Sequence, residues 1–160
     1  MLFRSKRFGT SPERKNILLG WLEHRAQLTK IGFTEGYQWL DGSFVEDAET
    51  RLGRSPKDID VVTFAARPSD IPDFAAFVEE HTHLFSPKIT FARFFTDAYF
   101  VDLGLSALDI VDHVRYWHGL FSHRRATFEW KGMLQVPLLS DDLQARSILK
   151  TLEDQYVAQT

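Results

Sequence analysis

The chain has 160 residues, 44% of them hydrophobic and 26% charged, which is the composition of an ordinary globular protein of about one domain. It has no cysteine, so disulfides, iron–sulfur clusters, thiolate zinc sites and a cysteine nucleophile are excluded. The net charge of -3 gives no overall basic field for nucleic acid, and only local basic clusters remain, near residues 4–15 and 124–131.

No run of the chain approaches the ~18 apolar residues that cross a bilayer, and no apolar stretch follows the basic N-terminus as in a signal peptide. We therefore expect a cytoplasmic protein with no membrane partner.

Four segments have the capping residues or the apolar spacing of helices. Ser11-Pro12 places a capping residue before a proline in the first turn, and apolar residues then recur at helical spacing until Gly32. Ser106 opens a pattern that resembles a capping box, with Asp109 at its end. The predicted helices span residues 12–30, 69–85, 106–117 and 141–156.

Short runs rich in β-branched and aromatic residues predict the strands, over residues 37–40, 58–64, 89–101 (one long strand or two short ones) and 128–138. Residues 46–57 are expected to form a polar loop. The order of these elements predicts an α/β or α+β fold with a small mixed β-sheet flanked by helices. We expect a single domain over residues 1–160, with a core at about 8–138 and a C-terminal helix at about 141–156.

The most informative stretch joins Gly42-Ser43 to Asp58-Ile59-Asp60-Val61 across that loop. Residues two apart in a strand point to the same face, so Asp58 and Asp60 would present two neighbouring carboxylates. Two such charges repel unless a cation neutralises them, and hard oxygen ligands suit Mg²⁺ or Mn²⁺ bound to nucleotide phosphates. A turn at Gly42-Ser43 would let backbone amides and the serine hydroxyl approach a phosphate closely. Taken alone, each part has an ordinary alternative, a solvated acidic pair or a simple turn.

In this order the residues resemble the signature of the nucleotidyltransferase superfamily, which includes DNA polymerase beta. The signature is a hydrophobic residue, Gly, then Gly or Ser, and after a loop Asp-hydrophobic-Asp/Glu-hydrophobic; Gly42, Ser43, Asp58 and Asp60 match it. The loop of 14 residues between Ser43 and Asp58 is slightly longer than the common spacing. The chain is more closely similar, over about residues 8–138, to a family of short bacterial proteins placed within the superfamily. The features shared with that family are Glu13-Arg14-Lys15, Leu18-Leu19, Leu40-Asp41-Gly42-Ser43-Phe44-Val45, Pro56-Lys57-Asp58-Ile59-Asp60-Val61 and Lys131-Gly132-Met133.

The resemblance implies a third carboxylate on a later strand, which helps to hold the metal and acts as general base on the attacking hydroxyl. Asp97 and Asp102 are the candidates, and because they lie five apart in one regular strand, only one of them can face the site. We favour Asp97 in the middle of the strand, since Asp102 comes just before Gly104 and could simply end it. Asp41 lies either close to the site or in the turn, bonded to the backbone.

Two basic residues are candidate ligands for the nucleotide phosphates. Arg93 shares strand parity with Asp97, and Lys57 stands beside Asp58. Surface exposure is the alternative for both.

The resemblance implies a metal-dependent nucleotidyltransferase, which moves a nucleoside monophosphate from an NTP to an unknown acceptor (RNA, protein or small molecule) and releases pyrophosphate. Asp58, Asp60 and Asp97 would hold Mg²⁺ or Mn²⁺, and Gly42 with Ser43 would hold the β and γ phosphates. Because little of the chain remains beyond the catalytic sheet and its helices, a homodimer or a partner protein would complete the acceptor site. The alternative is a non-catalytic nucleotide-binding or partner-binding module of a toxin–antitoxin or phage-defence type.

Overall fold

The computed structural model describes residues 7–157, and for residues 152–157 it describes the backbone alone. The strands are β1 (Gly36–Asp41), β2 (Ile59–Ala65), β3 (Thr96–Asp102) and β4 (Leu134–Pro137). The helices are α2 (Pro12–Lys30), the short 3-10 helix η1 (Ser43–Val45), α3 (Ala48–Leu52), α4 (Phe74–Glu80), α5 (Thr82–Phe85), α6 (Pro87–Phe94), α7 (Ala107–Phe121) and α8 (Asp142–Val157).

The strands form one mixed sheet in the order β3-β2-β1-β4, which confirms the predicted fold class. β1 runs antiparallel to both β2 and β4, whereas β2 and β3 are parallel, with α4, α5 and α6 in the connection between them. A parallel pair needs such a long crossover, while β1 and β2 are joined by the segment that contains η1 and α3. β3 is therefore one edge of the sheet.

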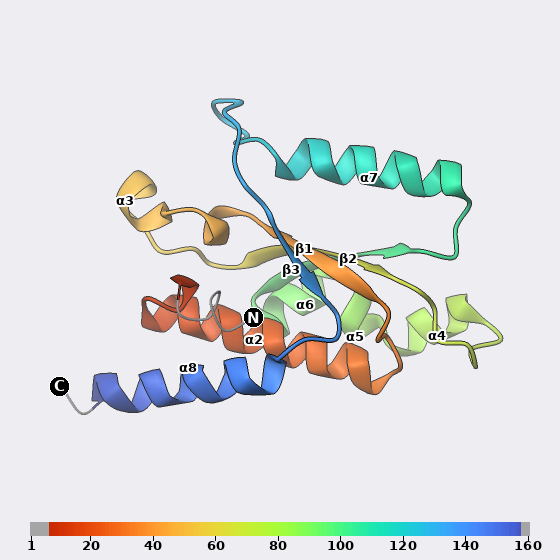
Figure 1. Ribbon diagram of the computed structural model, residues 1–160, viewed down its shortest axis with the longest axis horizontal. Helices are drawn as coiled ribbons and strands as arrows, with labels where there is room; N and C mark the ends of the chain where they lie inside the picture. Colours follow the sequence, from red (N-terminus) through yellow and green to blue (C-terminus); the bar gives the residue numbers. More distant parts are fainter. Residues whose placement is uncertain (1–6, 158–160) are drawn as a thin grey trace.

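Helices cover both faces of the sheet (Figure 1). α7 lies on one face, and α2, α8 and α6 lie on the other. On the α7 side, Trp117 and Phe121 pack against Trp39, Phe64 and Val101 of three successive strands. On the opposite side, the apolar residues of α2 pack with Leu40 and Val61. Side chains along β1 and β2 point alternately to the two faces of the sheet, so each face has its own hydrophobic core.

The predicted strand over residues 89–101 is wrong in its first half, because that half is helix α6. Pro87 occupies the first turn of α6, where its fixed φ favours a helix, and Thr90 and Phe94, four apart, supply the buried face. Gly20 lets α2 cross α6 closely, since a Cβ there would lie 2.2 Å from the Phe94 carbonyl oxygen. Phe95, with φ +53°, then turns the chain into β3.

Other boundaries differ less. The predicted helix over residues 69–85 is two shorter helices, α4 and α5, which meet at His81, and residues 69–73 are not helical. The predicted loop over residues 46–57 contains α3, and the last strand is confined to β4. Among residues 7–157, no helix combines the length and the apolar character needed to cross a membrane.

Candidate functional site

Three aspartates lie side by side across the sheet, one on each of three neighbouring strands. The register pairs Asp41 of β1 with Asp60 of β2, and Asp60 with Asp97 of β3. Since each shares strand parity with a residue that packs under α7 (Trp39, Val62 and Val101), all three side chains point to the α7 face. Asp58 stands two residues before Asp60, just ahead of β2, and adds a fourth carboxylate at the same end of the strands.

Burial and mutual repulsion raise the pKa values of these carboxyl groups. Burial, followed by the charges of Asp58, Asp41 and Asp97, raises the pKa of Asp60 from 3.8 to about 6. Burial and the Asp97 charge also raise the pKa of Asp58. The pKa of Asp41 is raised by burial, although the ammonium group of Lys131 opposes this shift. The cluster is thus a concentration of negative charge that a cation would relieve.

Gly42 permits the closest approach of the chain to this cluster. Its φ of +85° lies in the region that favours glycine, and a Cβ there would be 2.6 Å from Asp60 Oδ2. The next residue, Ser43, begins η1. The Gly42-Ser43 turn therefore lies directly against the Asp60 carboxylate.

Replacing Gly42 by alanine is expected to destabilise the protein by about 2–4 kcal/mol, because strain at a positive φ adds to a clash with Asp60. Gly53→Ala is the matched control: φ is +64°, but nothing lies within 4 Å of a Cβ at that position. It should cost only about 1 kcal/mol. Gly42 also has ψ -170°, a backbone region that is essentially restricted to glycine, whereas Gly53 has the ordinary left-handed conformation. Urea denaturation of both variants checks the difference, and equal losses would show that neither this conformation nor the contact with Asp60 constrains Gly42.

A cavity of about 530 Å³ opens over the carboxylates. It combines Asp41, Asp58, Asp60 and Asp97 with the Gly42-Ser43 turn on one side. The lining also includes basic side chains from two distant parts of the chain: Arg51, Arg54, Arg124, Arg125 and Lys131. A single cavity thus presents both cation-binding and anion-binding chemistry.

Acidic residues hold several of these cations in place. Lys131 Nζ lies 2.6 Å from Asp41 Oδ2, and both side chains are at most 10% exposed. Glu46 pairs with Arg124 at 2.6 Å and with Arg51 at 3.3 Å, so it joins the segment after β1 to the segment after α7. Arg125 is exposed, and its charge opposes the rise in the pKa values of Asp58 and Asp60. Ion pairs therefore hold Lys131, Arg51 and Arg124 beside the carboxylates.

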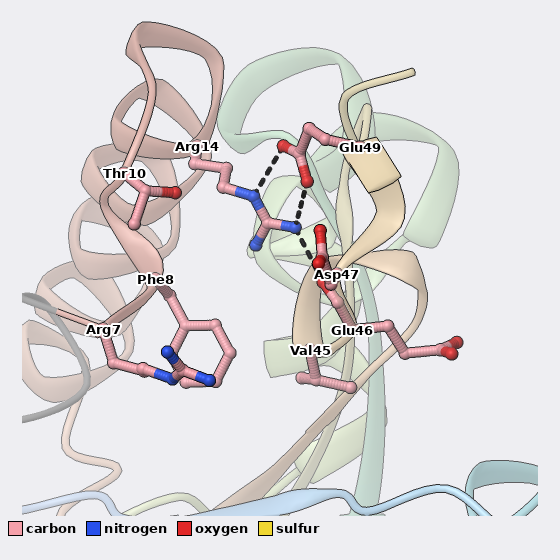
Figure 2. Close-up of a pocket in the computed structure, with 8 residues that line it drawn as sticks. All are labelled: Arg7, Phe8, Thr10, Arg14, Val45, Glu46, Asp47 and Glu49. Carbon is pink, nitrogen blue, oxygen red and sulfur yellow. Dashed lines mark hydrogen bonds and ion pairs between the residues drawn. The ribbon is translucent and has the colours of Figure 1, made fainter. Parts of the chain in front are cut away.

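Arg14 of α2 anchors the loop that follows the Gly42-Ser43 turn (Figure 2). Its guanidinium donates to both carboxylate oxygens of Glu49, at 2.7 and 2.8 Å. It also donates to the backbone carbonyls of Phe44 and Glu46, each at 2.7 Å. Arg14 is 4% exposed, so these bonds are largely sheltered from water. Arg14 therefore ties η1 and the start of α3 to the longest helix of the fold.

The donor set suits a hard divalent cation, because it consists of carboxylate oxygens. One oxygen of the 3% exposed Asp41, Oδ1, is buried without a hydrogen-bond partner. Within residues 7–157, however, no three His, Cys, Asp or Glu side chains are gathered closely enough to hold a metal ion. The carboxylates are thus near enough to repel one another, and a cation would have to draw them together.

The structure brings five of the predicted site residues to this cavity, namely Gly42, Ser43, Asp58, Asp60 and Asp97. It places the alternative third carboxylate, Asp102, at the other end of β3, where Arg67 forms an ion pair with it.

The structure does not bring Lys57 or Arg93 into the described lining of the cavity. Lys57 is exposed just before Asp58. Arg93 is exposed on α6 rather than on a strand, so its supposed parity with Asp97 does not exist.

Four arginines of the cavity, Arg51, Arg54, Arg124 and Arg125, are not among the predicted phosphate ligands. Arg124, Arg125 and Lys131 form a local basic cluster in the sequence, and this cluster is a usable signal. Arg51 and Arg54 have no such signal, because only the folded chain brings them to the carboxylates.

No curated protein and no solved structure matches the chain. A profile of the family of unknown function DUF6932 matches residues 3–137, which include the carboxylate cluster, the Gly42-Ser43 turn and every basic residue of the cavity. The chain therefore belongs to the DUF6932 family.

Proposed function

We propose that this protein is a metal-dependent nucleotidyltransferase that moves a nucleoside monophosphate from an NTP to an acceptor. One observation carries the proposal. A single cavity contains Asp58, Asp60 and Asp97 together with a glycine-serine turn and five basic side chains. A metal–NTP complex needs both halves of this lining, carboxylates for the metal and cations and amides for the phosphates.

The two kinds of group suggest how the NTP would lie. Lys131 is held by Asp41 of β1, and Arg51 and Arg124 are held by Glu46 just after β1, so the fixed cations gather on the β1 side. The β and γ phosphates would bind there, beside Gly42 and Ser43. Asp58 and Asp60 would hold Mg²⁺ or Mn²⁺, with Asp97 completing the set. The bound metal would neutralise the phosphates and lower the pKa of the acceptor hydroxyl.

In the proposed reaction, an acceptor oxygen attacks the α-phosphorus of the NTP as the bond to the bridging oxygen of the β-phosphate breaks. Pyrophosphate leaves with that electron pair, and the proton of the acceptor hydroxyl passes to the Asp97 carboxylate. Tyr99 donates a hydrogen bond to Asp97 Oδ2 at 3.2 Å, and so would orient Asp97 for this role. The rate gain would come from positioning and charge neutralisation.

In the test, the protein is incubated with NTPs that carry a label on the α-phosphate and with RNA, protein or small molecules from a cell extract. Transfer of the label to each of these pools and release of pyrophosphate are measured in parallel. Asp97→Asn should lower transfer by at least about 10²-fold, because it removes the general base. Asp102→Asn, on the same strand but at its other end, should keep transfer within about threefold of wild type once samples are matched for folded protein. NTP binding without pyrophosphate release in any pool would instead support a non-catalytic binding module.

A further inference from the structure

A second cavity, of about 560 Å³, lies along the free edge of β3. Its walls come from opposite sides of the sheet, with α7 on one side and α4 and α5 on the other (Figure 1). The lining is mostly aromatic and apolar: Phe74, Val78, Phe85, Pro87, Tyr99, Phe100, His113, Tyr116 and Trp117. A volume of this order is typical of small-molecule sites.

The aromatic rings form two walls. On the α7 side, Trp117 lies 4.8 Å from Tyr99 and 5.0 Å from Tyr116, measured between ring centroids. On the other side, Phe100 lies 5.4 Å from Phe85 and 5.9 Å from Phe74. Between such walls a planar ring binds more favourably than a flexible chain, because a rigid ring loses little conformational entropy when it stacks.

The edge of β3 offers a planar ligand one free backbone donor and one free backbone acceptor, the N–H and C=O of Phe100. In the parallel ladder the residues of β3 with odd numbers bond to β2, as Ile59 N–H to Phe95 C=O and Leu103 N–H to Ala65 C=O show. The N–H and C=O of Phe100 therefore point away from β2, and within residues 7–157 neither has a partner. They form an adjacent donor and acceptor, to which the Watson–Crick edge of a nucleobase is complementary.

The same edge offers only a short row of groups to an added peptide strand. The Ala98 N–H already donates to Thr90 Oγ1 at 3.3 Å, and the Asp102 carbonyl accepts from Leu105 N–H at 3.3 Å, which leaves the outward groups from the Ala98 carbonyl to the Asp102 N–H. Strand addition gains its affinity from a long row of such groups, whereas a base needs one donor and one acceptor. The lining and the edge together favour a nucleobase.

Tyr99 connects this cavity to the carboxylates, since its ring lines the cavity and its hydroxyl bonds to Asp97. If the leaving pyrophosphate lies on the β1 side, in-line attack brings the acceptor from the opposite side, at β3. We infer that the cavity along β3 binds the base of a nucleoside or nucleotide acceptor; that this ligand is the acceptor rests on the proposed function, while base binding does not.

The experiment titrates adenosine, guanosine, cytidine and uridine into the full chain by calorimetry, with and without Mg²⁺ and the saturating α,β-methylene analogue of each of the four NTPs in turn. At least one nucleoside should bind equally well in the presence of the analogues. Tyr116→Ala, at a 61% exposed wall position, should weaken that binding about 10-fold. Val78→Trp should obstruct part of the cavity and weaken binding by at least about 10-fold, whereas Leu108→Ala, on α7 but outside the lining, should leave the Kd unchanged.

The inference is overturned if no nucleoside binds, or if neither Tyr116→Ala nor Val78→Trp changes the Kd of the nucleoside. Displacement of the nucleoside by an analogue would overturn it too, because the base of the donor would then occupy the cavity. Failure of the proposed function is distinct: none of the four analogues would bind with Mg²⁺, while nucleoside binding would still respond to Tyr116→Ala. That result would keep the base site and remove its role as an acceptor site.

Discussion

Asp60→Asn is expected to make the metal-free protein more stable and, in the same variant, to abolish nucleotidyl transfer. At neutral pH the metal-free wild type must keep Asp60 charged beside Asp58, Asp41 and Asp97, in a partly buried place. A neutral amide of the same shape removes that repulsion. The gain should be about 1–2 kcal/mol, which raises the melting temperature by about 3–6 °C.

The pH dependence of this effect has a definite sign. Because the fold raises the pKa of Asp60 from 3.8 to about 6, the folded chain holds a proton there that the unfolded chain has released. The Asp60 carboxyl group makes its full contribution to the free energy of unfolding below about pH 4, and this contribution is lost as the pH rises through about 6. The metal-free wild type should therefore lose stability over that interval relative to Asp60→Asn.

Addition of Mg²⁺ and NTP should reverse the order of the two proteins. The wild type should gain stability, because the cation neutralises the cluster, while Asp60→Asn should gain little and lose at least about 10²-fold in transfer rate. Asp112→Asn, at an exposed surface pair on α7, is the control and should change the melting temperature by no more than about 1 °C. A destabilised metal-free Asp60→Asn would contradict the electrostatic account of the cluster.

Arg25→Met is expected to cause a large loss of stability, about 3–5 kcal/mol. Arg25 lies on α2 and is 1% exposed. Its guanidinium donates to Asp142 at 2.6 Å, to Gln38 at 3.0 Å and to the carbonyl oxygens of Pro137 and Leu138 at 2.7 and 2.9 Å. One side chain thus joins α2 to β1, to the end of β4 and to α8. Methionine fills much of the volume but takes the guanidinium donor away from Asp142 Oδ2 and from the carbonyl oxygens of Pro137 and Leu138, while Gln38 Oε1 keeps the Trp21 Nε1–H donor.

The measurement is urea denaturation, with Arg146→Ala as the control. Arg146 pairs with Glu23 at 2.9 Å, and both side chains are partly exposed, so its loss should cost less than about 1 kcal/mol. A similar small cost for Arg25→Met would mean that water replaces the lost bonds and that the network does not hold the fold together.

Local patterns in the sequence were sufficient for the parts of the site that depend on strand parity. Asp58 and Asp60 could be assigned to one face from their spacing alone. Asp97 lines the cavity as predicted, but it is the second residue of β3 and not in the middle of a strand, because residues 87–94 form α6. The register of β3 against β2 then sets Asp97 beside Asp60 and Asp102 at the far end. The order of predicted helices and strands was likewise sufficient to predict a mixed sheet.

The sequence was insufficient where composition and tertiary contacts favour different structures. Residues 89–94 contain Ile, Thr and Phe, which favour a strand, yet a close crossing with α2 at Gly20 and the proline at position 87 stabilise a helix. Arg93 was misassigned for this reason. Arg25 resembles an ordinary surface residue in the sequence of α2, because most of its partners, Pro137, Leu138 and Asp142, lie more than a hundred positions away.

Thermal unfolding with each of the four NTPs, with and without Mg²⁺ or Mn²⁺, tests the central claim most directly, using wild type beside Asp58→Asn/Asp60→Asn. The account predicts that at least one NTP raises the melting temperature of the wild type only when the metal is present, and that the double variant loses this shift. If no NTP with either metal shifts the wild type, or if the double variant responds equally, the carboxylate cavity is not a metal–nucleotide site.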